Sequence, residues 1–302
     1  VAYAVSMFFA GCSFHAEAMV VICAFMSHLR YTVSMKFSAA NVFSRSLRAL
    51  LCAVFLCAGG VAWGEDYVYN GSWSPTQPMY ASLSAGDTVT INSDLTLNGA
   101  RTVPSGVIVT VSSDAKLELS GGEWTIAGTV RNYGTFSVTN GGSNSGTIAN
   151  YGTFNTASSF TNSGTITNES SGTVTFSNGV TSTGAITNNG TMKSTSGGGI
   201  TISSGTLVNT GTITVNDSNL NVSGLFTNSG EINGTNAELT IISSGTATNS
   251  GTITISKGVD VGMGATFINT GTANNVKGAG TVIDGNSPHG TGNEYYWAGT
   301  AG

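Results

Sequence analysis

The sequence predicts an all-β fold, a single-stranded right-handed parallel β-helix (a solenoid) of about ten coils, each of 18–22 residues. Three observations support this fold class: a glycine that recurs about every twenty residues, an asparagine at a fixed distance after it, and short apolar–polar alternations between them. A repeat of this length is typical of solenoids, in which each unit stacks on the next. The right-handed sense follows from the crossover rule for parallel strands.

The repeat is defined by the glycine that opens each unit. Successive glycines are 18 to 21 residues apart, and the units share the consensus G-T-I-x-N-x-G-T-I. The asparagine follows the glycine by four residues in seven of the eight units and by five in the last, which we interpret as a unit with one extra residue. The unit glycines are Gly128, Gly146, Gly164, Gly184, Gly205, Gly224, Gly245 and Gly264, and the asparagines are Asn132, Asn150, Asn168, Asn188, Asn209, Asn228, Asn249 and Asn269.

Each unit reads as short strands joined by tight corners. The Asn-x-Gly segment is expected to turn a corner, with glycine at positive φ and asparagine tolerating the left-handed region. Because each strand would pair with its counterpart one coil later, about 4.8 Å away, equivalent asparagines are expected to form a ladder of bonded amides. Period-two alternation, as in residues 212–215, indicates strands. A third apolar cluster closes each unit, at Phe160, Val180, Ile200, Ile202, Leu220, Val222, Leu239, Ile241, Val259 and Val261.

Residues 35–64 are typical of a secretory signal peptide. Lys36, Arg45 and Arg48 form a basic region, and an apolar run of ten residues, 49–58, follows it. Small residues then lie at the −3 and −1 positions of a cleavage site, so we expect the chain to be cut before Glu65. The alternative is a membrane anchor, but the run is shorter than the ~20 apolar residues that a span needs.

The remaining boundaries follow from the signal peptide and the repeat. We expect Met35 to be the initiator, with an extended two-part signal as the alternative reading of the residues before it. Proline and tryptophan between the signal and the first coil suggest a cap, which would cover the unpaired strand edges of an open coil. The expected parts are a doubtful upstream segment 1–34, the signal peptide 35–64, an N-terminal cap 65–83, the parallel β-helix 84–285, and a tail or truncated continuation 286–302.

Charge and cysteine content exclude several classes of function. Only 8% of the residues are charged, and from Glu65 onward the chain carries six basic and fourteen acidic residues, a net charge of 6 − 14 = −8. The basic residues are scattered, so nucleic-acid binding, which needs clustered positive charge, is not expected. All four cysteines precede residue 65, so the rest of the chain can hold no disulfide framework and no cysteine metal site.

The signal peptide, the cysteine-free NxGTI array and the low charge together resemble the passenger domains of bacterial autotransporters and filamentous-haemagglutinin-like adhesins. The resemblance covers residues 84–285 and depends on the style of the repeat. It implies a parallel β-helix that is secreted or displayed at the cell surface, on the outer membrane. It also implies a translocator after the passenger, so we expect either a continuation beyond the tail 286–302 or export by another route.

The main alternative function is a β-helical carbohydrate-active enzyme, either a polysaccharide lyase or a glycoside hydrolase. Acid–base cleavage of a glycosidic bond needs two carboxylates at a defined separation. The candidate carboxylates are Asp87, Asp94, Asp114, Glu118 and Glu123. Only Asp94 and Asp114 are loosely in phase with the coil, and solvated corner residues are the simpler interpretation. His289, the only histidine after the signal, lies in the tail, and neither a GxSxG elbow nor a calcium-binding GGxGxD repeat is present.

A remote alternative is an ice-binding protein. Flat threonine arrays on a β-helix resemble ice-binding surfaces, whereas threonine is also an ordinary outward-facing strand residue. The array is broken, because several units lack a pair. The Thr-x-Thr pairs are Thr88/Thr90, Thr165/Thr167, Thr173/Thr175, Thr212/Thr214 and Thr252/Thr254.

We therefore expect a non-enzymatic, adhesin-like protein with no catalytic residues, no cofactor and no metal. Its partner would be a host surface, a glycan or another copy of the chain, contacted through polar side chains and the exposed aromatics Tyr133 and Tyr151. We expect no nucleic-acid partner and no membrane span in the mature chain.

Overall fold

The computed structural model describes residues 64–71, 83–195 and 197–285, and these residues are all β-strand, turn and irregular chain, without a helix. The upstream segment, most of the signal peptide, much of the expected cap and the tail with His289 lie outside these ranges. In the part of the chain described, no helix has the length and apolar character needed to cross a bilayer.

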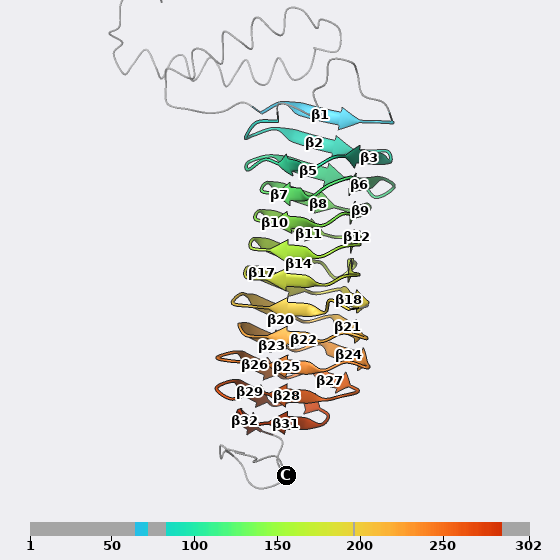
Figure 1. The fold of residues 1–302 in the computed structure, drawn as a ribbon. Helices are drawn as coiled ribbons and strands as arrows, with labels where there is room; N and C mark the ends of the chain where they lie inside the picture. Colours follow the sequence, from blue (N-terminus) through green and yellow to red (C-terminus); the bar gives the residue numbers. More distant parts are fainter. Residues whose placement is uncertain (1–63, 72–82, 196, 286–302) are drawn as a thin grey trace, which may run out of the picture. The chain divides into compact units, whose positions relative to one another are not determined.

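Three parallel sheets, here called A, B and C, run along the stack of coils (Figure 1). Each inner strand pairs in parallel with the strand one coil before it and the strand one coil after it, and each end strand pairs with one neighbour. Sheet A contains β1 (Asp66–Tyr69), β2 (Thr88–Ile91), β5 (Ile108–Val111), β8 (Thr129–Asn132), β11 (Thr147–Asn150), β14 (Thr165–Asn168), β17 (Ala185–Asn188), β20 (Thr206–Asn209), β23 (Leu225–Asn228), β26 (Thr246–Asn249), β29 (Thr266–Asn269) and β32 (Thr281–Asp284).

Sheets B and C have ten strands each. Sheet B contains β3 (Leu95–Asn98), β6 (Lys116–Ser120), β9 (Thr135–Val138), β12 (Thr153–Thr156), β15 (Thr173–Phe176), β18 (Thr191–Thr195), β21 (Thr212–Asn216), β24 (Glu231–Thr235), β27 (Thr252–Ile255) and β30 (Thr272–Ala273). Sheet C contains β4 (Arg101–Val103), β7 (Trp124–Ile126), β10 (Gly142–Asn144), β13 (Phe160–Asn162), β16 (Val180–Ser182), β19 (Ile200–Ile202), β22 (Leu220–Val222), β25 (Leu239–Ile241), β28 (Val259–Val261) and β31 (Val276–Gly278).

Each coil runs through one strand of sheet A, one of sheet B and one of sheet C. Ten complete coils, from β2–β4 to β29–β31, lie between β1 and β32, which confirms the predicted parallel solenoid of about ten coils. Two of these coils, β2–β4 and β5–β7, precede the repeat array that begins at Gly128. Strand β1 falls inside the expected cap 65–83, and it is itself the first strand of sheet A.

The core is a set of side-chain columns inside the coils. Strands alternate between outward and fully buried residues, and the third apolar cluster predicted from the sequence supplies the buried positions of sheet C. Phe136 and Phe154 stack with ring centroids 5.1 Å apart. In a column of sheet C a small residue separates two large ones, because Gly142 lies in register between Trp124 and Phe160.

The predicted asparagine ladder is present and buried. Each Nδ2 donates to the Oδ1 of the next asparagine, at 2.7–2.8 Å, in an unbroken series from Asn132 to Asn269. Asn188, for example, also donates to the carbonyl oxygens of Gly190 and Thr212, and it is completely buried. The side-chain amide of Asn188 thus bonds to the neighbouring ladder asparagines, to the backbone of its own corner and to the backbone of the next coil. A buried polar group needs such hydrogen-bond partners.

A second, shorter ladder lies where sheet C turns into sheet A, and the sequence analysis missed it. Asn144 donates to Asn162 at 2.7 Å, and Asn162 donates to the hydroxyl of Ser182 at 3.0 Å. The next residue in this column is Ile202, so the column changes from polar to apolar. The signal was the same Asn-x-Gly pattern at residues 144–146 and 162–164.

The expectation that the Asn-x-Gly corners use the left-handed backbone conformation is wrong. No ladder asparagine, and no glycine of the Asn-x-Gly corners, has a positive φ. Glycine is needed there for space, because a Cβ on Gly152 or Gly211 would overlap the carbonyl oxygen of the equivalent glycine one coil earlier. The repeat alignment also needs one correction. Ala265 is the residue in register with Gly245, so Asn269 lies four residues after it and the unit has no extra residue before its asparagine.

We expect Asn188→Leu to lower the free energy of unfolding by about 3 kcal/mol, because leucine matches the volume but leaves buried amide and carbonyl groups unpaired. The neighbouring Asn189→Ala is the control, since Asn189 is only half-buried and accepts one hydroxyl hydrogen bond from Thr210. Its expected loss is below about 1 kcal/mol. Urea unfolding measures both, and equal losses would contradict a stabilising ladder.

We expect Gly211→Ala to destabilise the protein by about 2 kcal/mol, because the added methyl group meets the backbone of residues 189–190. Gly285→Ala is the matched control, since the nearest contact of its Cβ would be the Thr270 methyl group, at 3.3 Å, and the backbone atoms of residues 269–270 would lie at 3.8 Å or more. Thermal unfolding of the two variants compares them. A corner whose glycine served only a turn conformation would show no difference in melting temperature between them.

Candidate functional site

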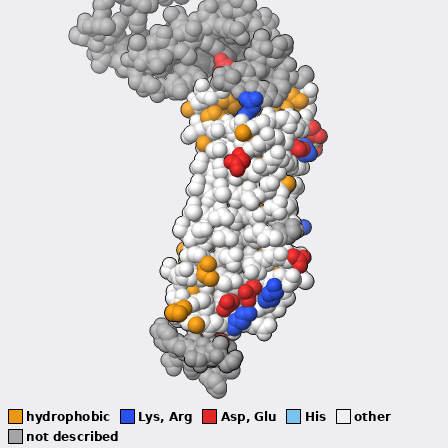
Figure 2. All heavy atoms as spheres, in the orientation of Figure 1, with side chains coloured by type: hydrophobic (Ala, Val, Ile, Leu, Met, Phe, Trp, Pro, Cys, Tyr) orange, Lys and Arg blue, Asp and Glu red, His pale blue; other side chains and the backbone are white. Residues whose placement is uncertain are grey.

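The outward faces of the solenoid are mostly uncharged and polar. In sheet C the central residue of each strand points outward, and this column consists of hydroxyl and amide residues until it reaches Asp260 and Lys277. Figure 2 shows the same surface, largely free of charge, with acidic and basic side chains gathered toward the ends of the stack. The uncharged members of the column are Thr102, Thr125, Ser143, Thr161, Thr181, Thr201, Asn221 and Thr240.

Tyr133 and Tyr151 form a stacked, exposed pair. Their ring centroids are 4.7 Å apart with an interplanar angle of 12°. Each ring follows a ladder asparagine at the corner between sheets A and B, and 45% of Tyr133 and 37% of Tyr151 are exposed. The backbone N–H of each tyrosine donates to the preceding coil, so both rings stand on fixed backbone. The pair offers a rigid aromatic surface with two hydroxyl groups, the kind of surface that binding interfaces favour.

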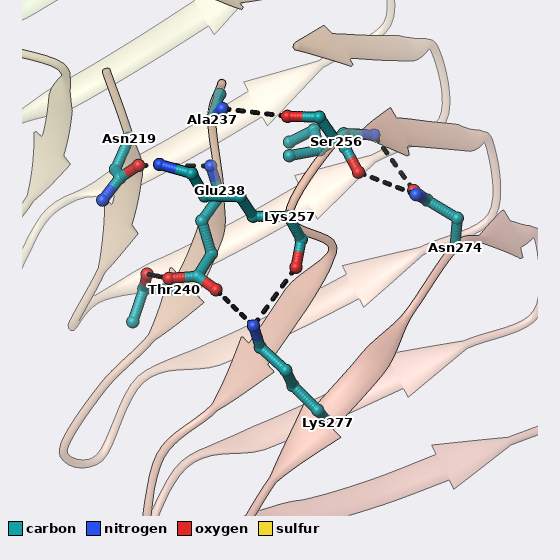
Figure 3. Close-up of polar contacts among 9 residues, drawn as sticks. Asn219, Ala237, Glu238, Thr240, Ser256, Lys257, Asn274 and Lys277 are labelled. Atoms are coloured by element: carbon teal, nitrogen blue, oxygen red, sulfur yellow. Dashed lines mark hydrogen bonds and ion pairs between the residues drawn. The ribbon is translucent and has the colours of Figure 1, made fainter. Parts of the chain in front are cut away.

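A charged cluster lies on the last coils (Figure 3). Lys277 Nζ lies 2.7 Å from Glu238 Oε1 and donates to the carbonyl oxygen of Lys257 at 3.2 Å. Thr240 donates to the other oxygen of Glu238, at 3.5 Å. Glu238 and Lys277 are 39 residues apart and lie two coils apart, so the ion pair bridges the coil between them. Sequence analysis missed this pair because only the coil register brings the two residues together.

The cluster stabilises the positive charge of Lys277 and does not supply this lysine as a general base. The hydrogen bond that Lys277 donates to Glu238 raises the pKa of Lys277 above its ordinary value. Burial opposes this effect less strongly, and the carboxylate charges of Glu238 and Asp260 add smaller increases. Lys277 therefore stays protonated at neutral pH and is a poor nucleophile or proton acceptor. The geometry is that of a brace across the terminal coils.

The carboxylates predicted as candidates for an enzyme are not brought together as a pair. Asp94 is aligned with Lys116, whose backbone N–H it accepts at 2.9 Å, and not with Asp114. The expected alignment of Asp94 with Asp114 is therefore wrong by two residues. The chain turns between Asp114 and the start of strand β6 at Lys116, so counting residues misplaces the register. Glu118 pairs with Lys116 at 2.6 Å, while Asp114 and Glu123 are exposed. Asp87 is buried and accepts two backbone N–H groups.

The Thr-x-Thr pairs are divided between two faces. Residues 88–90 and 165–167 lie on sheet A, whereas residues 173–175, 212–214 and 252–254 lie on sheet B. On sheet B, Lys193 and Asn233 interrupt the threonine column. The structure therefore does not gather the predicted pairs into one flat array.

Residues that could hold a metal do not cluster in the described part of the chain: no group of three or more histidine, cysteine, aspartate or glutamate side chains has suitable geometry there. His289 lies outside the described residues. In comparisons with protein-family models, curated proteins and solved structures, none matched the chain. The candidate site therefore stands on its own geometry, with the tyrosine pair as the surface most suited to contact a partner.

We expect Lys277→Met and Glu238→Gln each to lower the free energy of unfolding by less than about 1 kcal/mol, because the lysine side chain is 53% exposed and water screens the pair. Since the folded pKa of Lys277 is raised, the contribution is present below its unfolded pKa and is lost as pH rises through the folded pKa. Urea unfolding at neutral and strongly alkaline pH measures both effects. Glu231→Gln is the control, and a loss of several kcal/mol for Lys277→Met alone would contradict a screened pair.

Proposed function

We propose that the chain is an exported, non-enzymatic structural protein, an adhesin-like stalk of the autotransporter-passenger type that is secreted or displayed at the cell surface. Its mechanism is presentation: a rigid stack of coils holds side chains at fixed positions along its length. The observation that carries the proposal is the exposed, stacked tyrosine pair on a surface that is mostly polar and uncharged.

The regular interior supports a presenting role. An unbroken amide ladder and continuous apolar columns give the coils of the array 128–271 the same internal supports. Each corner repeats at the coil spacing, which makes a series of equally spaced positions for contact. Repeat proteins commonly use such extended surfaces for binding.

The chemistry of the tyrosine pair favours a glycan as the partner. The outer ring faces are free to pack on apolar patches of a sugar ring, and the hydroxyl groups can bond to its polar substituents. The neighbouring corner residues are Ser112 and Glu169, one coil away on either side. The Ser112 hydroxyl donates to Asn92, so it offers a ligand an acceptor, and Glu169 offers a carboxylate acceptor. Apart from Glu169, the neighbouring members of this corner column, Asn92, Ser112 and Asn189, are uncharged, which suits a neutral ligand better than an anionic one.

The engagement of the carboxylates supports this proposal over a β-helical carbohydrate-active enzyme. Asp87, Asp94, Glu118 and Glu238 each accept a hydrogen bond or form an ion pair within the fold. None of them faces a second carboxylate across a described groove in the way that general acid–base cleavage needs. The division of the threonine pairs between two sheets weighs likewise against ice binding.

A glycan array probed with the purified, processed protein tests the proposal. We expect Tyr133→Ser with Tyr151→Ser to weaken binding of the glycans that the protein retains by about tenfold or more, because rigid aromatic anchors dominate such contacts. Met263→Ser is the matched control, since Met263 is 82% exposed and lies elsewhere on the stack. Turnover of any bound glycan, detected as shortened products, would instead favour the enzyme. Equal binding by both variants would remove the tyrosine pair from the proposal.

A further inference from the structure

Asp87 is the one carboxylate that is buried among the described residues, with 4% of its surface exposed. It opens the first complete coil, directly before β2. Burying an ionised carboxylate is costly unless strong donors or a positive charge compensate it. Asp87 forms no ion pair with any other described residue, so its present compensation comes from neutral donors.

Two backbone nitrogens supply that compensation. Glu65 N donates to Asp87 Oδ1 and Ser84 N donates to Asp87 Oδ2, both at 2.7 Å. The carbonyl oxygen of Glu65 in turn accepts the N–H of Thr88, at 2.9 Å. Strand β1 is therefore attached to the first coil at the nitrogen of Glu65, the same atom at which the sequence predicts cleavage.

The residue before Glu65 is crowded. A Cβ on Gly64 would overlap the backbone of residues 86–87, so only glycine fits while the chain is uncut. Removal of the residues before Glu65 would end the close approach of Gly64 to the backbone of residues 86–87. It would leave the Glu65 nitrogen next to the buried carboxylate of Asp87.

We propose that cleavage before Glu65 turns Asp87 into the receptor of the new N-terminus, with the α-ammonium group of Glu65 forming a buried ion pair that fastens β1 to the first coil. A signal peptidase would add water across the Gly64–Glu65 bond: the water oxygen leaves with Gly64 as part of its carboxylate, and both hydrogens of the water go to the Glu65 nitrogen, which becomes an ammonium group. This inference depends on the proposed export. The inference extends the proposed export by giving signal-peptide cleavage a structural consequence, the ion pair between Glu65 and Asp87.

The other ionisable groups at this corner leave the ammonium group available to Asp87. The Glu65 carboxylate accepts a hydrogen bond from the Tyr67 hydroxyl at 2.8 Å, and Asp66 accepts one from Thr88 at 2.6 Å. Burial and this contact raise the pKa of Tyr67 to about 12, so the phenol stays neutral. The turns at residues 83–86 and 104–107, which pack here, carry no ionisable side chain. An ammonium group replaces one amide N–H by a charged donor with three hydrogens, and charge-assisted bonds are the stronger class.

The test compares processed proteins that differ only in whether Glu65 is the first residue or is preceded by three small residues. Expression of residues 35–302 in an export-competent bacterium, followed by mass spectrometry of the N-terminal peptide, is expected to give Glu65 as the first residue. A second version carries Gly-Ser-Gly inserted between Gly64 and Glu65, so that after the same cut the Glu65 nitrogen remains an amide preceded by glycine. Hydrogen exchange then measures the protection of β1 in both versions, with Asp87 and with Asp87→Asn.

We expect the insertion to reduce the exchange protection of β1 by about tenfold or more, because it removes the ion pair while leaving the carboxylate in place. Asp87→Asn should reduce protection further in the version that starts at Glu65 than in the inserted version. Because the folded pKa of the α-amino group would be raised above its ordinary value of about 8, the advantage should be complete at pH 6 and lost as pH rises through the folded pKa.

Two results overturn the proposal: a first residue other than Glu65, or equal protection of β1 with and without the insertion. If Asp87→Asn does not fold, the comparison of the two versions with Asp87 still decides. Failure of the adhesin proposal is separate, because loss of glycan binding leaves the N-terminal residue and its exchange unchanged. Recovery of only the uncut chain would count against both export and this inference.

Discussion

The constraint on which the structure depends is that each residue lies on its own counterpart in the next coil, about 4.8 Å away. A side chain in this arrangement must tolerate a copy of itself above and below. Apolar side chains do so by packing, while a charged side chain would face its like charge inside the fold. Asparagine is suited to a buried column because its amide both donates and accepts. The series from Asn132 to Asn269 consists of seven such contacts in one direction.

The same constraint explains the glycines of the corners better than turn geometry does. At a corner the backbones of successive coils approach each other most closely, and a Cβ on Gly211 would overlap the backbone of residues 189–190. The corner therefore needs a residue without a side chain and does not need a left-handed one. At the other corner, between sheets C and A, alanine occupies the position in register with Gly245, and the turn closes through the bond from Ala265 N to the Gly262 carbonyl oxygen.

Periodicity made the coil number, the main ladder and the sheet C core predictable, since each of these features recurs at one fixed offset. The features that sequence reasoning missed depend on register between segments that do not repeat. Asp94 and Asp114 looked in phase by residue count, but alignment of Leu95 with Leu117 places Asp94 beside Lys116. The short ladder through Asn144 spans only three coils, too few to stand out. The expectation of positive φ failed because the sequence shows that a corner uses glycine but not why. Glycine can be selected for its freedom at positive φ or for its lack of a side chain, and here the second property matters.

Stacking also determines where the fold is incomplete. A column satisfies its members only while both neighbours continue it, and the first amides of the two ladders, Asn132 and Asn144, have buried Oδ1 atoms without a hydrogen-bond partner among the described residues. In each case the preceding coil offers an apolar side chain, Val111 or Ile126. Their cost, about 1–3 kcal/mol each, is sustained by the coils that follow. Residues at the ends of columns and at outward corners are released from the rule of self-tolerance. The stacked tyrosine pair lies at such an outward corner, and the buried carboxylate of Asp87 lies at the first coil. At these positions the contact that a neighbouring coil does not supply can come from a partner or from a new N-terminus.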